Sequence, residues 1–210
     1  MKPPAEHHEA SNPFSTRFIR PGAVPFLFPP EQAGAKQDLD ALADRLSSLG
    51  SRSQIVGPHG SGKSTLVRQL MDQLAQRGLP SYLVSLHDGE RRMPAGWAKA
   101  AQQMAARLVI VDGYEQLGAW SRWMLKFRCR IRGWQLLVTA HQDVGLPTLF
   151  RTATDLATAR SIVAHLLAPS DKNIDETTIA DSFAAARGSV RDMLFALYDR
   201  YEQRTRHGSS

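Results

Sequence analysis

The feature that most constrains this chain is a glycine-rich stretch that fits the pattern G-x-x-x-x-G-K-[S/T] at every fixed position. It reads Gly57-Pro58-His59-Gly60-Ser61-Gly62-Lys63-Ser64-Thr65. Such a loop curls its backbone N–H groups around a polyphosphate, and glycines at positions 57, 60 and 62 permit the backbone angles and the close approach that this requires. We therefore predict that residues 57–65 form a phosphate-binding loop for a nucleotide.

The segments on either side of the loop have the pattern that this prediction needs. Residues 53–56 are typical of a short buried strand, and apolar residues then recur at helical spacing until Gly78 and Pro80 end the helix. In this arrangement Lys63 would reach the β- and γ-phosphates, Ser64 would place its hydroxyl on Mg²⁺, and the helix N-terminus would face the anion. A glycine-rich turn that matches by chance would not have both flanks.

Length and composition allow one α/β core with a small helical subdomain. The chain has 210 residues, of which 42% are hydrophobic, and its single cysteine excludes an internal disulfide framework. No apolar run approaches the length of a membrane span, and the first nine residues have no signal-peptide core. We therefore expect a soluble, cytoplasmic protein with no membrane partner. The net charge of +6 is compatible with nucleotide or nucleic-acid partners and does not choose between them.

Apolar periodicity beyond the loop predicts alternating strands and helices. Strands are expected at 81–86, 108–112, 135–140 and 148–154, and helices at 35–49, 97–106, 115–130, 155–167, 174–187 and 189–204. This alternation predicts an α/β fold, a parallel sheet of the P-loop NTPase type flanked by helices, with a small C-terminal helical subdomain. We divide the chain into an extended, partly disordered N-terminal segment (1–30), a P-loop core (31–168) and a lid-like helical subdomain (169–210).

The proline-rich segment from residue 12 to residue 30 is too broken for regular structure, yet it carries four aromatic residues. These are Phe14, Phe18, Phe26 and Phe28. We expect them to pack on the domain, and we favour a strap that covers the domain edge because aromatic residues more often anchor than recognise. A lip over the nucleotide base is the alternative.

Residues 108–112 place four apolar residues directly before an aspartate. That pattern is typical of a buried parallel strand that delivers a carboxylate to its C-terminal edge. Asp112 is therefore the candidate for the Walker B aspartate, which would hold Mg²⁺ through water. The alternative is an aspartate that only starts a turn before Gly113.

A predicted strand lies between the phosphate-loop unit and the Walker B strand, and a glutamate follows soon after Asp112. With these features the chain resembles the additional-strand branch of the P-loop NTPases, which includes the AAA+ ATPases and the STAND signalling NTPases. The STAND Walker B commonly runs apolar-apolar-apolar-Asp-Gly-x-Asp-Glu, and this chain has Val111-Asp112-Gly113-Tyr114-Glu115-Gln116. The resemblance implies Mg-ATP as ligand and Glu115 as the catalytic glutamate, although many AAA+ proteins carry theirs where Gly113 stands here.

Two further positions follow from the same resemblance. Thr139 matches the polar sensor residue that contacts the γ-phosphate or the attacking water, with His141 as a rival two residues later. Arg191 resembles the lid arginine that closes on the phosphates. The plain alternatives are a β-branched residue in a strand for Thr139 and an exposed arginine in a first helical turn for Arg191.

A basic run with interleaved aromatic residues is the main candidate for nucleic-acid contact. It comprises Arg122, Trp123, Lys126, Phe127, Arg128, Arg130, Arg132 and Trp134. Such residues bind nucleic acid through phosphate contacts and stacking, but the i, i+2 spacing of the last three arginines spreads them around a helix. We therefore favour a solvated helix end, and we expect the aromatic residues to face the core.

Three function classes follow from these observations. The first is an ATPase that acts as an AAA+/STAND-like switch or motor, with a protein partner or self-assembly. The second is a P-loop kinase for a small molecule or nucleotide, and the third is an ATP-binding interaction module that does not hydrolyse. No L-S-G-G-Q-like signature supports an ABC-type ATPase, and no N-K-x-D-like motif supports guanine, so ATP is the expected nucleotide.

Overall fold

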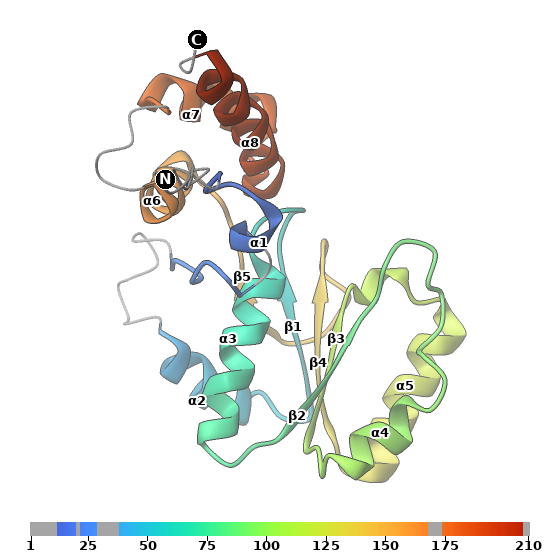
Figure 1. Ribbon diagram of the computed structural model, residues 1–210. Coiled ribbons are helices and arrows are strands. Elements are labelled where there is room, and N and C mark those ends of the chain that lie inside the picture. The colour runs from blue at the N-terminus through green and yellow to red at the C-terminus, as the bar shows by residue number, and fades with distance from the viewer. Residues whose placement is uncertain (1–11, 20–21, 29–37, 168–173, 208–210) are drawn as a thin grey trace, which may run out of the picture.

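The computed structural model describes residues 12–19, 22–28, 38–167 and 174–207. It has a parallel sheet with helices on both faces, and a cluster of C-terminal helices that lies beyond one end of the strands (Figure 1). The disorder expected before Asn12 and the helix start expected at Ala35 lie outside the described residues. No helix in the described part of the chain has the length and apolar character that crossing a membrane requires.

The sheet has five parallel strands in the order β2-β3-β4-β1-β5. The strands are β1 (Arg52–Val56), β2 (Ser81–Ser85), β3 (Leu108–Asp112), β4 (Gln135–Ala140) and β5 (Thr148–Arg151). The central strands β3 and β4 are buried along almost their whole length, which explains why they are runs of apolar residues without polar alternation. The prediction of a parallel α/β sheet flanked by helices is confirmed.

The register of the strands brings their polar C-terminal ends to one edge of the sheet. Val56 at the end of β1 pairs with Ala140 of β4, and Val111 of β3 pairs with Val138 of β4. The phosphate loop after β1 and the aspartate at the end of β3 therefore lie at the same edge, with β4 between them. Ligands of open α/β sheets bind at this carboxyl edge.

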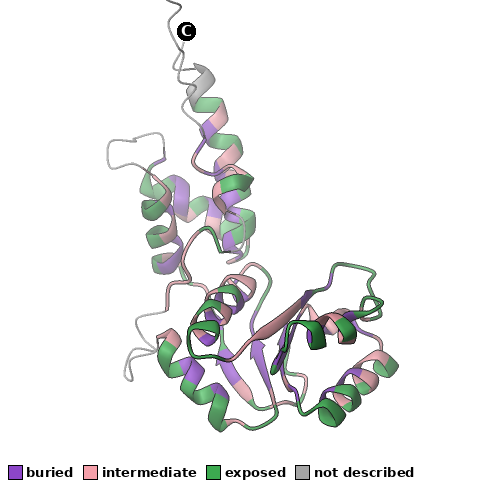
Figure 2. Cartoon of the chain, turned by 60° about the horizontal axis from the view of Figure 1, so that its bottom comes forward, coloured by how far each residue is buried: buried purple, intermediate pink, exposed green. Residues whose placement is uncertain are grey.

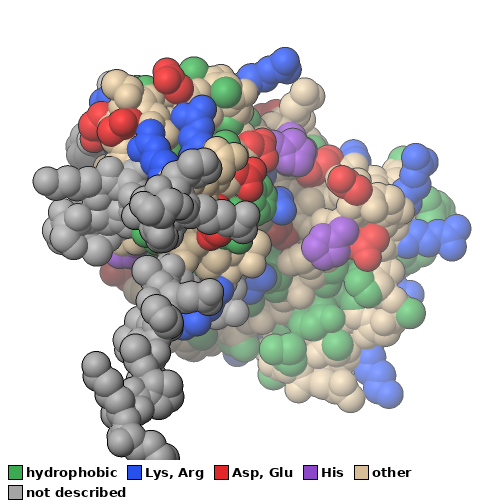
Figure 3. All heavy atoms as spheres, turned by 45° about the horizontal axis from the view of Figure 1, so that its top comes forward, with side chains coloured by type: hydrophobic (Ala, Val, Ile, Leu, Met, Phe, Trp, Pro, Cys, Tyr) green, Lys and Arg blue, Asp and Glu red, His purple; other side chains and the backbone are tan. Residues whose placement is uncertain are grey.

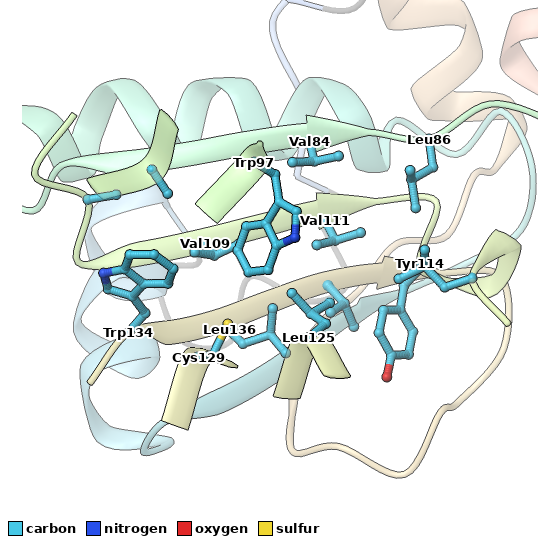
Figure 4. Close-up of a cluster of buried hydrophobic side chains, with 14 residues drawn as sticks. Val84, Leu86, Trp97, Val109, Val111, Tyr114, Leu125, Cys129, Trp134 and Leu136 are labelled. Atoms are coloured by element: carbon cyan, nitrogen blue, oxygen red, sulfur yellow. The ribbon is translucent and has the colours of Figure 1, made fainter. Parts of the chain in front are cut away.

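Each face of the sheet is covered by two helices (Figures 1 and 2). Helices α2 (Leu39–Ser48) and α3 (Lys63–Gln76) cover one face, and α4 (Trp97–Gln103) and α5 (Ala119–Arg132) cover the other. Under α4 and α5, Trp97 and Trp134 pack with Cys129 on buried valine and leucine side chains of the strands (Figure 4). Burial raises the pKa of Cys129 to about 12, so this thiol stays protonated and contributes packing.

The C-terminal cluster consists of α6 (Leu156–Leu166), α7 (Glu176–Ala185) and α8 (Val190–His207). Helix α6 falls within the 31–168 range that we assigned to the core, but its Ala159 and Val163 are buried in this cluster. The boundary at residue 168 stays a prediction.

The N-terminal segment is anchored at two places by aromatic side chains. Phe14, next to the short helix α1 (Thr16–Ile19), is fully buried in the C-terminal cluster and packs edge-on against Tyr201. Further along, the rings of Phe26 and Phe28 pack edge-on against Phe150 of the edge strand β5. These contacts fit a strap over the edge of the domain, the favoured interpretation. The ring of Phe26 also lies beside Gly62 of the phosphate loop, where a Cβ would be 3.1 Å from it, so a lip over the nucleotide base stays an alternative prediction.

The helix expected to begin at Glu115 begins four residues later, so that prediction was wrong at its start. Gly113, with φ of +85°, turns the chain sharply after β3, and Glu115 lies in η2 (Tyr114–Gln116), a single 3-10 turn. Gly118 then caps α5. Several other elements are shorter than predicted. Among them, β2 ends at Ser85, α4 at Gln103 and β5 at Arg151, and α7 spans Glu176–Ala185.

The prediction that the aromatics of the basic run face the core is wrong for two of the three. Trp134 is buried, but Trp123 and Phe127 are 50% and 46% exposed. The sheet is covered by the opposite side of α5, where Leu125 and Cys129 are buried. Residues four apart share one side of a helix, so burying that pair turns Trp123 and Phe127 outward.

Candidate functional site

The phosphate loop connects the buried end of β1 to the first turn of α3. Gly60 and Gly62 have φ values of +68° and +83°, and Gly62 is the N-cap of α3, which begins at Lys63. The predicted strand–loop–helix arrangement is thus present, and the free N–H groups at the start of a 14-residue helix face the loop. Ser64 and Thr65 lie in the first turn, both partly exposed.

Two glycines of the loop let other elements approach its backbone closely. A Cβ at Gly57 would lie 2.0 Å from Oγ1 and 2.4 Å from the carbonyl oxygen of Thr152, just after β5. A Cβ at Gly60 would lie 2.3 Å from Oγ of Ser189 and 3.2 Å from the backbone nitrogen of Arg191. The loop therefore packs directly against both the last strand and the start of α8.

We expect the Gly57→Ala variant to be less stable than wild type by at least about 1–3 kcal/mol, the usual cost of overpacking. The new methyl group would clash with the backbone of Thr152, which cannot rotate away as a side chain can. Thermal unfolding of the two proteins measures this. Gly118→Ala is the matched control, because a Cβ there would lie 3.7 Å from its nearest neighbour. Equal melting temperatures for Gly57→Ala and wild type would contradict the packing.

Lys63 lies in the centre of the site and is bound to its own loop. Its Nζ donates to the carbonyl oxygens of Gly57 (2.6 Å) and Pro58 (2.7 Å) and lies 3.3 Å from Nδ1 of His141. Burial lowers the pKa of Lys63, while the carboxylates of Glu115 and Asp112 act in the opposite direction. The two acids predicted from the β3 segment are thus electrostatic neighbours of the loop lysine.

Glu115 pairs with a histidine and not with a helix end. Its Oε1 lies 2.6 Å from Nε2 of His141, whose pKa is lowered chiefly by burial, with Glu115 opposing that shift. The arrangement fits a neutral imidazole that accepts from Lys63 at Nδ1 and donates to Glu115 from Nε2. The other oxygen, Oε2, is buried and has no hydrogen-bond partner among the described residues. The His141 ring in turn lies over His59 of the loop, with centroids 3.6 Å apart.

Asp112 is held by Thr139 of the neighbouring strand. The Thr139 hydroxyl donates to Oδ1 of Asp112 (2.5 Å) and accepts from the backbone N–H of Gly113 (3.0 Å). It thereby fixes both the carboxylate and the turn that leads to Glu115. Thr139 is almost fully buried, and its hydroxyl is engaged in these two hydrogen bonds.

The turn that carries Glu115 is also fixed from α5. Arg122 donates to the carbonyl oxygens of Glu115 and Leu117, each at 2.8 Å, and its guanidinium lies over the ring of Tyr114. In the sequence Arg122 is one residue of the basic run, and nothing in the spacing of that run distinguishes it from its neighbours. The sequence therefore does not predict that Arg122 holds the backbone of the Glu115 turn.

Arg191 begins α8 beside the loop, but its side chain is exposed. Its backbone nitrogen lies close to Gly60, whereas its guanidinium carbon lies 5.8 Å from the ring of Phe195. The structure thus brings Lys63, Asp112, Glu115, Thr139 and His141 together, and it places the Arg191 side chain along α8. Its predicted lid role stays a prediction.

The oxygen atoms of the site fit Mg²⁺ bound together with phosphate. Mg²⁺ prefers hard oxygen ligands and is usually held by one or two protein groups plus phosphate oxygens and water. Ser64 and Asp112 would supply the protein groups, and the unpaired Oε2 of Glu115 is a further oxygen nearby. Among the described residues, no three His, Cys, Asp or Glu side chains cluster as a metal site of their own, so phosphate oxygens would have to complete the coordination.

Comparison with solved structures shows where this fold occurs. The chain is similar to Drosophila ORC bound to DNA (TM-score 0.61, 14% identity, covering 99% of this chain and 64% of that one). It is similar to Cdc6p from Pyrobaculum aerophilum (TM-score 0.64, 16% identity, 92% and 66%) and to AMPPCP-bound DnaA from Aquifex aeolicus (TM-score 0.50, 16% identity, 75% and 58%).

At this level of sequence identity, the similarities show the fold alone. No protein-family model matches the sequence, and no curated protein sequence does so significantly. The chain spans 58–66% of the length of the three structures, at 14–16% identity. From its strand order, its phosphate loop and these neighbours, we conclude that the chain has the α/β fold of a P-loop NTPase.

Proposed function

We propose that this protein binds Mg-ATP and hydrolyses it slowly, as an AAA+/STAND-like switch. The observation that carries the proposal is the convergence of Lys63, Asp112 and Glu115 at the phosphate loop, with one buried oxygen of Glu115 unpaired. An unpaired buried acceptor is costly, so it is expected to have a function. The AMPPCP-bound DnaA neighbour supports an ATP-type ligand.

Binding would begin with an exchange of hydrogen bonds at Lys63. Its ammonium group would leave the carbonyl oxygens of Gly57 and Pro58 and donate to the β- and γ-phosphates, while the N–H groups of the loop enclose the anion. Ser64 would hold Mg²⁺ directly, and Asp112, oriented by Thr139, would hold it through water. Bound Mg²⁺ would neutralise charge on the phosphates.

Hydrolysis would depend on Glu115 as the group that orients a water molecule and accepts its proton. His141 fixes one carboxylate oxygen by a hydrogen bond, which leaves the other to accept from water. Arg122 holds the backbone of the same turn. The imidazole therefore acts as a positioning group for Glu115.

A conformational change would be transmitted from the loop to the C-terminal helices through their direct contact. Gly60 lies against Ser189 and Arg191 at the start of α8, so a change in loop conformation on binding would displace α8. The proposal concerns nucleotide binding and hydrolysis, and it assigns no DNA or protein partner to this chain.

Calorimetry of the full chain with ATP and GTP, each with Mg²⁺ or with EDTA, tests the binding step. Single-turnover phosphate release then separates an ATPase from a module that only binds. Formation of ADP that requires an added acceptor, with the phosphoryl group found on that acceptor and not as free phosphate, would indicate a kinase, the alternative function. Absence of Mg-ATP binding would overturn the proposal.

In that assay, we expect Asp112→Asn to raise the Mg²⁺ concentration needed for tight binding by roughly 10–100-fold, the usual effect of losing an outer-sphere group. The asparagine oxygen can still accept from Thr139, so the fold should be kept. Asp72→Asn, at an exposed aspartate of α3, is the matched control. An unchanged Mg²⁺ titration would remove Asp112 from the metal site.

A further inference from the structure

The outer side of the α4–α5 layer carries most of the large apolar residues that the described chain exposes. These are Met104, Trp120, Trp123, Phe127 and Ile131, with exposed fractions from 46% to 70%; Phe195 on α8 is the sixth. Four of them, Trp120, Trp123, Phe127 and Ile131, recur every three or four residues along α5. We call this stripe the α5 ridge. It covers three helical turns, about 16 Å at 1.5 Å per residue.

The three rings of the α5 ridge stack on one another along the helix. The centroids of Trp120 and Trp123 are 5.0 Å apart, and the rings of Trp123 and Phe127 are 5.3 Å apart and tilted by only 7°. Trp123 therefore has a ring neighbour one turn before it and one turn after it along the helix. Bases of single-stranded nucleic acid stack on free ring faces, so this arrangement does not favour that partner.

The positive charge of the protein is concentrated in the same part of the chain. Residues 91–142 contain nine Lys and Arg but only two Asp and Glu, Asp112 and Glu115, which belong to the nucleotide site. This gives the segment a formal charge of +7, compared with +6 for the whole chain. Helix α5 contains no acidic residue. On the side of the molecule where α4 and α5 lie, hydrophobic and basic side chains appear next to one another (Figure 3, right).

Basic side chains of α5 border the α5 ridge on both sides. At 100° per residue, Lys126 and Arg130 lie on one side of the stripe and Arg128 on the other. Among the described residues none forms a salt bridge with these three. An apolar aromatic stripe between two rows of cations is the pattern of helices that lie on anionic lipid surfaces.

We propose that the α5 ridge docks this protein on an anionic membrane surface. Trp120, Trp123, Phe127 and Ile131 would enter the boundary between headgroups and acyl chains, and Lys126, Arg128 and Arg130 would contact lipid phosphate and carboxylate groups. A surface contact of this kind needs no membrane-spanning helix. The proposal therefore departs from our expectation of no membrane partner, which rested on the lack of a long apolar run in the sequence. Each apolar residue type of the ridge suits the lipid boundary, whereas isoleucine would contribute nothing to base stacking.

Other occupants fit the α5 ridge less well. A second copy docked ridge to ridge would bring two helices without acidic residues together, and like charges repel. A single partner helix lying along three turns would bury less than the about 1,200 Å² at which specific interfaces begin. A lipid surface imposes no such minimum area or matching shape.

Co-sedimentation of the full chain with phosphatidylcholine vesicles, with and without phosphatidylserine, tests the proposal. We expect binding to the anionic vesicles that weakens as salt rises, and little binding to the neutral ones. Tryptophan emission should shift to the blue on binding, because Trp120 and Trp123 are exposed while Trp97 and Trp134 are already buried.

Two variants locate the surface. Trp120→Ser combined with Trp123→Ser should weaken binding to anionic vesicles by at least about tenfold and remove the blue shift. Arg128→Gln combined with Arg130→Gln should weaken it by about tenfold or more without touching any aromatic residue. Phe195→Ser and Arg200→Gln on α8 are the matched controls for an exposed apolar and an exposed basic residue. Neither should change binding.

Four results would overturn the proposal. The first is no binding of the folded wild-type protein to anionic vesicles. The second is binding by both ridge variants that is as tight as that of wild type. The third is a ridge-dependent dimer of the protein alone in analytical ultracentrifugation, which would assign the surface to a second copy. The fourth is ridge-dependent binding of a single-stranded oligonucleotide that anionic vesicles do not compete away. Mg-ATP binding is measured separately, and its failure would leave this inference intact.

Discussion

The Lys63→Ala variant will bind Mg-ATP at least about 100-fold more weakly than wild type, since two hydrogen bonds from a charged group contribute about 3 kcal/mol or more. Lys63 is the charged side chain of the loop, and its Nζ already lies among the loop carbonyls where two phosphates would converge. Removing it also removes the positive charge between the carboxylates of Asp112 and Glu115. Calorimetric titration measures the loss of affinity.

Lys63→Met is the control that separates charge from packing at this position. Lys63 is only 8% exposed, so alanine would also leave a gap beneath the loop. Methionine keeps most of the apolar stem, so its fold should be closer to wild type while its ATP affinity should be as low as that of Lys63→Ala. Tight ATP binding by either variant would show that the loop does not hold the phosphates.

The Glu115→Gln variant will keep its ATP affinity and lose roughly 10²–10⁴-fold in single-turnover hydrolysis, the usual contribution of a general base. In the proposed complex the loop and the metal would hold the phosphates, so binding is not expected to depend on Glu115. A glutamine can still accept from His141 through its carbonyl oxygen, but it cannot take a proton from water. Phosphate release and calorimetry on one preparation measure both quantities.

Glu90→Gln is the matched control for this substitution, because Glu90 is an exposed glutamate whose carboxylate accepts only from a local backbone N–H in its own turn. Its hydrolysis rate should equal that of wild type. A Glu115→Gln variant that hydrolyses ATP at the wild-type rate would eliminate Glu115 as the base. The protein would then be better described as a switch that binds nucleotide without using this glutamate.

Glu115 does not cap the helix that follows it. Helix α5 starts at Ala119 with Gly118 as its N-cap, and no side chain caps it. Glu115 instead points to His141 on the segment after β4. The apolar pattern predicts a helix start at Glu115, whereas Gly113 forces a separate turn there.

The apolar runs predicted the central strands well because β1, β3 and β4 are buried along almost their whole length. A run such as 108–112 is typical of a strand inside a parallel sheet, and its terminal aspartate could be assigned to the carboxyl edge before the sheet order was known. The periodicity did not predict which side of α5 faces the sheet, because this helix carries apolar residues on two sides. Leu125 and Cys129 compete with Trp123 and Phe127 for the core, and only the sheet decides which pair is buried.

The sequence by itself determined the phosphate loop, the parallel α/β sheet and the acid at the end of β3, because spacing of glycines and runs of apolar residues act locally along the chain. Only the tertiary structure decided the contacts that depend on strand register and helix phase. These are the contact between Glu115 and His141, the hydrogen bond from Thr139 to Asp112, the packing of Gly60 against α8, and the exposure of the α5 ridge. Residues far apart in sequence meet there because β3, β4 and β1 end at one edge, and no local pattern encodes that meeting.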